Sequence, residues 1–320
     1  MPTPTHSFTA SEDTPPVVVA AIKSWISDLS WSQVRKLMST RRVMVGHSLC
    51  LDESRKLSPG ETVSVFEHSL PFPPKADAVT VEHIDRDIVV VNKPARMVTL
   101  RHKKERSWTR SKKELQPALE EVVPDLIYST DREDRPPVIS VHRIDKDTSG
   151  LLVFARHEQA KNALIEQFAA HDVVRTYRAI VLGKPGHQTV RCRLVRNRGD
   201  GLRGSTTHET NGKESVTHIE PIKTFRAKDG LEYTEIQCQL ETGRTHQIRI
   251  HLTELGHPVC GDNVYRSKFG EEPTPDRSSA PRLVLHAMEL GFSHPTTGEA
   301  LHFQANWPGD LKRFRERIES

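Results

Sequence analysis

The residue types that could do chemistry are densest in one segment, Val141 to Gly150, which reads VHRIDKDTSG. It holds two carboxylates, two basic side chains, a histidine and two hydroxyls, immediately before an apolar run that starts at Leu151. Loops held by rigid strands often carry catalytic groups, and Asp145 or Asp147 could act there as a nucleophile or a base. The same composition is also typical of a polar turn that begins a strand, so this segment alone leaves both interpretations open.

A second polar segment, residues 241–262, reads ETGRTHQIRIHLTELGHPVCGD. Its apolar residues recur at helical spacing and a glycine follows them, which predicts a helix from about Thr245 to Leu255. Arg249 lies beside the apolar stripe of this helix. A partly buried arginine needs an anionic partner, because an unpaired buried charge is strongly destabilising. We expect an aspartate of the first segment to be that partner.

The histidines and cysteines do not suggest a metal site. The chain has 17 histidines, but His246, His251 and His257 lack the H-E-x-x-H spacing and have no cysteine pair beside them. The 4 cysteines lie far apart, which also argues against a disulfide framework. We therefore expect no metal ion and no cofactor.

Length and charge set the context for these segments. The chain has 320 residues, enough for two domains, and a net charge of only +4. Basic residues are nevertheless concentrated in residues 101–113 and 31–60, which favours a nucleic-acid partner, although solvated surface charge would give the same pattern. No apolar run approaches the roughly 18 residues of a membrane span or resembles a secretory signal, which predicts a cytoplasmic location.

The first part of the chain predicts a small basic module. Residues 1–16 are rich in Thr, Pro and Ser and are expected to be a disordered leader. Residues 17–68 predict two helices, the second opened by a capping box of Ser30 and Gln33, followed by short strands and a Pro-Gly turn. The basic residues expected to face solvent on or just after the second helix are Arg35, Lys36, Arg41 and Arg42. Residues 69–78 contain three prolines and predict a stiff linker.

The larger domain is predicted to span residues 79–316. Strand patterns cover residues 79–91 with a break at 85–87, and then residues 151–155, 173–182 and 234–240. An amphipathic helix is predicted at 158–170, and a hairpin near the end joins 283–292 to 300–303. Residues 100–137 are expected to form a long basic insertion with partial helix. Strands outnumber helices and do not alternate regularly with them, so the predicted fold class is α+β.

Several motifs in order resemble one known family. The segments HRIDKDTSG, RTYRA and GRTHQIR are similar to those of the RluA-type pseudouridine synthases, and further matches extend the resemblance over roughly residues 79–310. The resemblance implies a central, mostly antiparallel mixed sheet with flanking helices. It also implies isomerisation of uridine to pseudouridine in structured RNA, without a metal or cofactor. The N-terminal module resembles an S4 RNA-binding domain, which would add phosphate contacts.

The resemblance assigns expected roles to individual residues. Asp145 matches the catalytic aspartate, and Arg249 matches its salt-bridge partner, which would favour the ionised carboxylate. Tyr177 matches an active-site tyrosine whose ring stacks on the uracil. Arg143 matches an arginine that fills the space left when the target nucleotide is flipped out.

Four positions carry weaker expectations. Lys93 lies in a motif, VNKPARMV, that borders the active site in the family, and it is expected to contact the RNA. Arg244 is either a phosphate contact or a surface arginine. Arg96 stands where the family usually has glycine, and it would be strained if the turn needs a positive φ. Asp147 is the alternative catalytic carboxylate.

The sequence leaves several functions open. Large-subunit ribosomal RNA is the expected substrate, and transfer RNA is an alternative. The protein is expected to be a monomer. A catalytically inactive RNA-binding or ribosome assembly factor is a second interpretation, although it would not need the trio of Asp145, Tyr177 and Arg249. A nucleoside or glycoside hydrolase using Asp145 and Asp147 as paired carboxylates is a third. The sequence does not choose between attack of Asp145 on C1′ and abstraction of a sugar proton.

Overall fold

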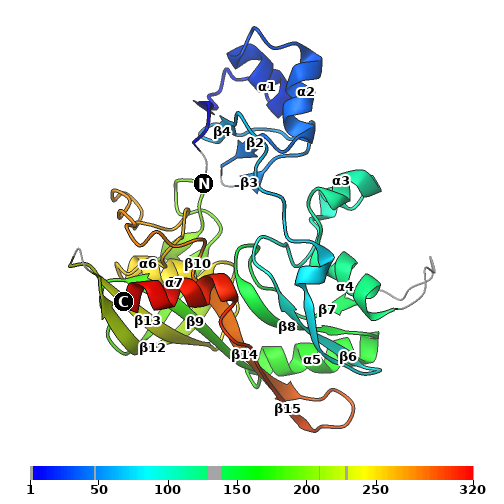
Figure 1. The fold of residues 1–320 in the computed structure, drawn as a ribbon, viewed down its shortest axis with the longest axis vertical. Coiled ribbons are helices and arrows are strands. Elements are labelled where there is room, and N and C mark those ends of the chain that lie inside the picture. Colours follow the sequence, from blue (N-terminus) through cyan, green and yellow to red (C-terminus); the bar gives the residue numbers. More distant parts are fainter. Residues whose placement is uncertain (1–2, 47, 129–137, 209, 228–229, 320) are drawn as a thin grey trace. The chain divides into compact units, whose positions relative to one another are not determined.

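The computed structural model describes residues 3–46, 48–128, 138–208, 210–227 and 230–319. The chain divides into two compact units, which Figure 1 draws as ribbons. Unit 1 consists of residues 1–72, 109–115 and 199–201, and unit 2 of residues 73–108, 116–198 and 202–320. The chain first passes from unit 1 to unit 2 within residues 69–78, where the sequence predicts a linker. No helix in the described ranges is long and apolar enough to cross a membrane.

Unit 1 packs two helices against a small antiparallel sheet. The helices are α1 (Val18–Trp25) and α2 (Trp31–Ser39), and the strands in sheet order are β1 (His6–Thr9), β4 (Thr62–Val65), β2 (Val43–Val45) and β3 (Ser48–Leu49). The predicted capping box begins α2: the Gln33 N–H donates to Ser30 Oγ at 3.3 Å, and the Ser30 N–H donates to Gln33 Oε1 at 2.6 Å. Apolar residues of both helices and of the strands form the core of this unit.

The prediction of a disordered leader at residues 1–16 is wrong where β1 forms. Residues 6–9 pair with β4 along their whole length, and the ring of Phe8 stacks on Trp25 with centroids 4.9 Å apart. The composition of residues 1–16 suggested disorder. The backbone N–H and C=O groups of β1 nevertheless form hydrogen bonds with β4, more than 50 residues later in the chain, and composition carries no information about such a pairing.

Two of the four arginine and lysine residues expected to bind RNA in unit 1 have structural roles. Arg41 follows the end of α2, has a φ of 62° and is 5% exposed. Its guanidinium donates to the carbonyls of Leu70 at 3.3 Å, of Pro71 at 2.9 Å and of Leu115. Arg42 is half-buried and donates to the Phe66 carbonyl at 2.7 Å. The prediction that Arg41 and Arg42 face solvent is therefore wrong, because buried loop carbonyls need donors.

Unit 2 is built on a mixed sheet that contains 11 strands within the described residues. Its order is β11-β10-β12-β13-β9-β14-β8-β6-β5, with β15 paired to β14 and β7 paired to β8. Every pair is antiparallel except β14 with β8. The strands are β5 (Thr80–Ile84), β6 (Ile88–Lys93), β7 (Ile139–Ser140), β8 (Ser149–Ala155), β9 (Val174–Leu182), β10 (Gln188–Val195), β11 (Gly204–Thr206), β12 (Lys213–Arg226), β13 (Glu232–Leu240), β14 (Leu285–Ser293) and β15 (Ala300–Gln304).

Both faces of this sheet are covered by helices. Along β6, Val89 and Val91 belong to one apolar cluster with residues of the helices α4 (Leu119–Ile127), α6 (Gln247–Glu254) and α7 (Gly309–Glu319). The alternate residues Ile88 and Val90 belong to a second cluster with α5 (Glu158–Ala170). Since successive side chains of a strand point to opposite faces, the two clusters lie on opposite sides of the sheet. The predicted α+β fold class is confirmed.

The basic segment 101–113 is divided between the two units. It contains the 3-10 turn Lys103–Glu105 in unit 2 and the helix α3 (Arg110–Glu114) in unit 1. Arg101 is buried, and its Nη2 lies 2.5 Å from Glu121 Oε2 on α4. The predicted insertion at 100–137 is thus partly helical as far as Ile127, and residues 129–137 of it lie outside the described residues.

Gly150 permits the close approach of β8 to β14. Its φ is 122°, and a Cβ atom there would lie 2.2 Å from the carbonyl oxygen of Ala287. Any other residue would force the two strands apart. The polar segment before β8 is therefore held beside β14.

Candidate active site

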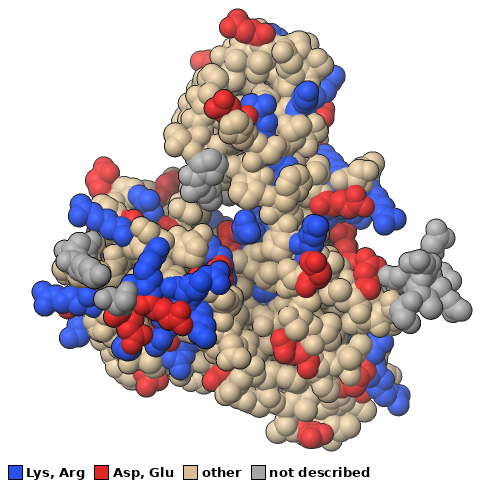
Figure 2. All heavy atoms as spheres, in the orientation of Figure 1, with Lys and Arg blue, Asp and Glu red and all other residues tan. Residues whose placement is uncertain are grey.

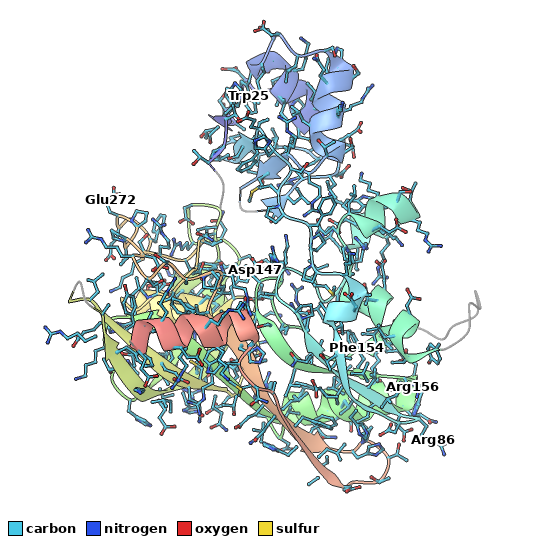
Figure 3. The ribbon with its side chains drawn as sticks, in the orientation of Figure 1. Trp25, Arg86, Asp147, Phe154, Arg156 and Glu272 are labelled. Atoms are coloured by element: carbon cyan, nitrogen blue, oxygen red, sulfur yellow. The ribbon has the colours of Figure 1, made fainter. Side chains whose placement is uncertain are left out.

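Three of the residues that the sequence singled out meet in one pocket of unit 2. The pocket has a volume of about 540 Å³ and is lined by Asp145, Tyr177 and Arg249. These side chains come from the loop before β8, from β9 and from α6. Arg143 and Arg244 also line this pocket. Asp147, labelled in Figure 3, follows on the same loop but is not one of the lining residues, which favours Asp145 as the carboxylate that meets a substrate.

The loop that carries Asp145 is fixed mainly through its backbone. Thr99 Oγ1 donates to the Ile144 carbonyl at 2.7 Å and accepts from the Ile144 N–H at 3.3 Å. The Thr148 N–H donates to the Asp145 carbonyl at 3.2 Å and closes the turn. The Asp145 carboxylate is thus left to face the pocket, and its side chain is 16% exposed.

Lys93 is buried beside this loop and bonds to its backbone. Its side chain is fully buried, and Nζ donates to the carbonyls of Met97 at 2.8 Å, Pro94 at 3.0 Å and Lys146 at 3.1 Å. Burial lowers the pKa of the amine to about 7, an effect that Asp147 and Asp145 oppose. The sequence predicts that Lys93 contacts RNA, whereas the structure surrounds its amine with backbone carbonyls.

Arg96, in the turn after Lys93, adopts the positive φ that the sequence analysis considered for this turn. Its φ is 67°, in the left-handed region where glycine is usual. A non-glycine residue there costs roughly 1–2 kcal/mol. The turn keeps its shape with an arginine at this strained position.

Tyr177 offers a neutral ring to the pocket. It lies on β9 and is 8% exposed, and burial raises the pKa of its hydroxyl to about 12. Its neighbour on the pocket wall, Arg175, was missed by the sequence analysis although it precedes Tyr177 in RTYRA. The Arg175 guanidinium lies 5.4 Å from the centre of the Phe168 ring and donates to the Glu241 carbonyl at 2.6 Å.

The predicted ion pair of Arg249 with Asp145 is wrong. Arg249 Nε donates to Asp262 Oδ2 at 2.6 Å, and Nη2 donates to Asp262 Oδ1 at 2.8 Å. The Asp262 side chain is fully buried and also accepts from the backbone N–H groups of Val264 and Tyr265. Burial alone would lower the pKa of Arg249, but the ion pair with Asp262 and the nearby charge of Asp145 raise it above its ordinary value. Asp262 is the last residue of the polar segment 241–262, so the sequence contained a nearby acid that could have been predicted as the partner of Arg249.

His246 does not line the pocket, but it lies close to Asp145, and the sequence analysis assigned it no role in the site. It begins α6 in a left-handed conformation with a φ of 61°. Its Nδ1 lies 2.8 Å from the hydroxyl of Tyr265, and its Nε2 lies 3.9 Å from Asp145 Oδ1. The sequence feature that could have pointed to His246 is its position in the GRTHQIR motif, between Arg244 and Arg249. This distance places the His246 imidazole near the Asp145 carboxylate.

Arg143 and Arg244 lie at the open side of the pocket. Both are exposed, and Arg244 Nε donates to the Glu214 carbonyl at 2.9 Å. On the face of the molecule that Figure 2 draws, Lys and Arg side chains are interspersed with Asp and Glu side chains.

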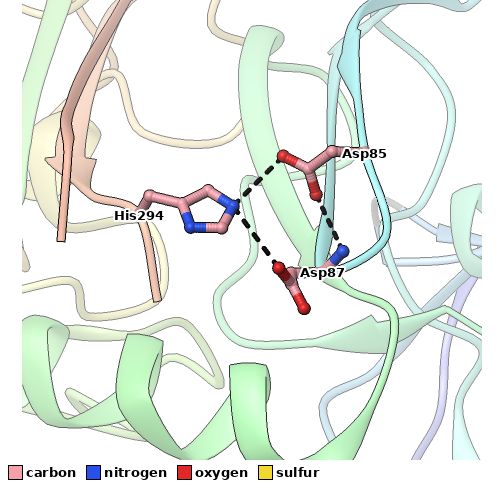
Figure 4. A group of neighbouring side chains, drawn as sticks. All are labelled: Asp85, Asp87 and His294. Atoms are coloured by element: carbon pink, nitrogen blue, oxygen red, sulfur yellow. Dashed lines mark hydrogen bonds and ion pairs between the residues drawn. The ribbon is translucent and has the colours of Figure 1, made fainter. Parts of the chain in front are cut away.

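A second cluster of ionisable side chains lies outside this pocket. Within the part of the chain that the structure describes, one group has ligand atoms close enough together to hold a metal ion: Asp85, Asp87 and His294, with these atoms all within 4.8 Å (Figure 4). His294 Nε2 lies 3.2 Å from Asp85 Oδ2 and 3.7 Å from Asp87 Oδ2. The sequence analysis weighed other histidines and did not anticipate this group.

The hydrogen bonds of His294 argue against a metal at this cluster. Its Nδ1 accepts from the backbone N–H groups of Thr296 at 3.3 Å and Thr297 at 3.1 Å. The proton of the neutral ring therefore lies on Nε2, where a metal would need the lone pair. We interpret the cluster as a hydrogen-bonded network that joins the β5–β6 turn to the β14–β15 turn.

This network predicts a loss of stability in acid. Burial alone would raise the pKa of Asp85, but hydrogen bonds from His83 and from the N–H groups of Ile88 and Asp87 lower it to about 2. A carboxyl group whose pKa falls on folding stabilises the protein above its unfolded pKa, and this contribution is lost as the pH falls from about 4 towards 2. Asp85→Asn should lower stability by about 1–2 kcal/mol at pH 7 and by progressively less below pH 4.

The measurement is thermal unfolding of both proteins between pH 7 and pH 3. Asp77→Asn is the control, because Asp77 is exposed. A difference between wild type and Asp85→Asn that stays constant over the whole pH range would contradict the argument.

Comparisons with known proteins identify the family and agree with the fold. A family model described as RNA pseudouridylate synthase matches residues 87–254, more than half of the chain. An uncharacterized RNA pseudouridine synthase of Bacillus subtilis is 34% identical over 310 residues, covering 91% of this chain and 90% of that protein. A ribosomal large subunit pseudouridine synthase D of Zymomonas mobilis is 34% identical over 301 residues, with coverage of 91% and 90%.

Among solved structures, the human RNA pseudouridylate synthase domain containing 4 aligns with a TM-score of 0.58 and 22% identity, over 76% of this chain and 95% of that one. The fold is shared, and the pocket brings together three motifs that are separate in the sequence. The family model and the relatives define an enzyme of the pseudouridine synthase class. The chain belongs to the RNA pseudouridylate synthase family, and the predicted resemblance of its catalytic domain is confirmed.

Proposed function

We propose that this enzyme isomerises uridines to pseudouridine in large-subunit ribosomal RNA, with Asp145 as its catalytic carboxylate. The observation that carries the proposal is the meeting of Asp145, Tyr177 and Arg249 in one pocket. The choice of RNA is supported by relatives named ribosomal large subunit pseudouridine synthase D, which are 34% identical in Zymomonas mobilis and 30% identical in Escherichia coli O157:H7. The proposal includes a cytoplasmic location and a monomeric state, both carried over from the sequence analysis.

The pocket suits the expected chemistry. The C1′–N1 bond of the uridine breaks, the base turns, and a C1′–C5 bond forms while the C5 proton is lost and N1 gains a proton. Asp145 acts at the sugar, by attack on C1′ or by removal of a sugar proton. The Tyr177 ring stacks on the base, and Arg143 enters the space that the flipped nucleotide leaves. Arg249, held by Asp262, supplies positive charge beside Asp145.

The test of this function is a map of pseudouridines in ribosomal and transfer RNA from cells with and without the gene. Sites that disappear on deletion should lie in large-subunit RNA and return with wild type, but not with Asp145→Asn. Sites lost from transfer RNA would change the substrate. An unchanged map, together with no activity of the purified protein on unmodified RNA, would favour an RNA-binding assembly factor.

For unit 1 we propose a role in RNA affinity, in line with its resemblance to S4 domains. Arg35 and Lys36 are exposed on α2 and are available for phosphates, although Arg35 lies 3.4 Å from Glu53. Replacing both with glutamine should weaken RNA binding and reduce the slope of log Kd against log salt by about 1–2. The rate at saturating RNA should not change.

Binding at several salt concentrations measures this effect. The matched control is replacement of Lys312 and Arg313 with glutamine, since they are also an adjacent exposed pair on a helix. Equal effects of the two double variants would mean that α2 contributes only general charge.

A further inference from the structure

The residue next to the catalytic carboxylate is a histidine with a second, buried partner. His246 Nε2 faces Asp145 Oδ1 at 3.9 Å, too long for a hydrogen bond but within reach of a small rotation of the carboxylate. On its other side, Nδ1 lies 2.8 Å from the Tyr265 hydroxyl. The rings of His246 and Tyr265 meet edge to face with centroids 5.3 Å apart. The imidazole is therefore held between an acid and a phenol.

The phenol determines which ring nitrogen carries the proton. Tyr265 is 1% exposed, and burial raises the pKa of its hydroxyl to about 12, so it keeps its proton at neutral pH. A buried hydroxyl needs an acceptor, and His246 Nδ1 provides one. With Nδ1 as the acceptor, the proton of the neutral imidazole lies on Nε2, towards Asp145.

Tyr265 itself is fixed by the elements that hold Arg249. Its ring lies 4.9 Å from the Arg249 guanidinium carbon, and its N–H donates to Asp262 Oδ1 at 3.0 Å. Thr253 Oγ1, on α6, donates to its carbonyl at 3.0 Å. The position of the phenol is thus set by the buried ion pair.

The charges around His246 agree with a neutral ring. Burial lowers the pKa of His246, Arg249 and Arg203 lower it further, and Asp145 and Asp262 oppose them. These groups come from α6, from the segment before β11, from the catalytic loop and from the loop after α6. A neutral imidazole can donate its Nε2–H to the Asp145 carboxylate without forming an ion pair with it.

We infer that His246 is a positioning residue for the reaction: through Nε2–H it orients the Asp145 carboxylate, and Tyr265 fixes the tautomer that makes this possible. The inference rests on the proposed role of Asp145. It gives the buried Arg249–Asp262 pair a second function, which is to hold the phenol.

The first test does not depend on activity. Long-range ¹H–¹⁵N spectra of histidine-labelled protein should show His246 protonated on Nε2 in the wild type and a mixture of tautomers in Tyr265→Phe. In Asp145→Asn the pKa of His246 should fall further, because the opposing charge is gone. A proton on Nδ1 in the wild type, or a titration that Asp145→Asn leaves unchanged, would overturn the inference, whatever RNA the enzyme modifies.

The second test is kinetic. His246→Gln should lower the single-turnover rate by up to about 100-fold with RNA affinity unchanged, since misplacement of a reacting group has effects of this size. Tyr265→Phe keeps the imidazole and should lower the rate by about 3- to 10-fold, as expected for one hydrogen bond. The control is His187→Gln, because His187 is exposed outside the pocket.

Wild-type rates in both His246→Gln and Tyr265→Phe, or a loss confined to RNA affinity, would overturn the positioning role. A wild type that converts no uridine would instead contradict the proposed function, and the spectra would still decide the proton arrangement. Melting temperatures of each variant separate a folding defect from a catalytic one, and if His246→Gln unfolds, Tyr265→Phe carries the test.

Discussion

Replacement of Asp145 by asparagine is expected to lower the rate of uridine isomerisation by at least about 10⁴-fold, as removal of a catalytic nucleophile does elsewhere. Asparagine has nearly the same shape but no charge, so it cannot attack C1′ or accept a sugar proton. RNA affinity should stay within about twofold, because one neutral amide replaces one carboxylate in a pocket whose loop is fixed by Thr99 and Lys93. Release of tritium from RNA labelled at C5 of uridine measures the rate.

The matched control is Asp147→Asn. Asp147 lies two residues further on the same loop and does not line the pocket, so its rate should remain close to wild type. If Asp147→Asn abolished turnover and Asp145→Asn kept it, the assignment of the catalytic carboxylate would be wrong.

The second large effect is expected at Asp262. Asp262→Asn keeps an oxygen that can accept from the Val264 and Tyr265 N–H groups, but removes the charge that pairs with Arg249. A buried arginine left without its partner costs about 3–5 kcal/mol. We expect this loss of stability in unit 2 together with a strong loss of activity, because Arg249 and Tyr265 would both shift at the pocket.

Hydrogen exchange of backbone amides in β9 and β14 reports on unit 2 by itself and measures the change. The control is Glu214→Gln, which breaks a pair with Arg191 at 2.5 Å whose side chains are 59% and 54% exposed. Exposed pairs contribute about 0–1 kcal/mol. Similar losses for the buried and the exposed pair would contradict the importance given to Asp262.

Local patterns in the sequence predicted local structure well. The helix predicted at 158–170 is α5 with the same bounds, the capping box at Ser30 is present, and the predicted hairpin near the end is β14 with β15. These features depend on periodicity, caps and turns within a few residues of one another. Such signals are contained in the sequence itself.

The errors concern long side chains whose surroundings are set by distant parts of the chain. Arg41 and Arg42 were predicted to face solvent and Lys93 to contact RNA, but each donates to backbone carbonyls within the fold. The partner of Arg249 was also misassigned. The helix pattern showed correctly that Arg249 needs an anion, but two acids were available, and only the path of the chain after α6 selects Asp262.

The position of β14 in the sheet has a consequence for synthesis of the protein. β14 lies between β9, which carries Tyr177, and β8, which follows the Asp145 loop, and it pairs with both. Its residues, 285–293, follow both β8 and β9 in the chain and are made after them. The pocket therefore cannot assemble on a nascent chain until nearly all of unit 2 has left the ribosome, and pairings this distant in sequence form slowly. A chain that stops before β14 would keep the β6–β8 and β13–β9 pairs but leave the other edge of β8 and of β9 exposed, which favours aggregation.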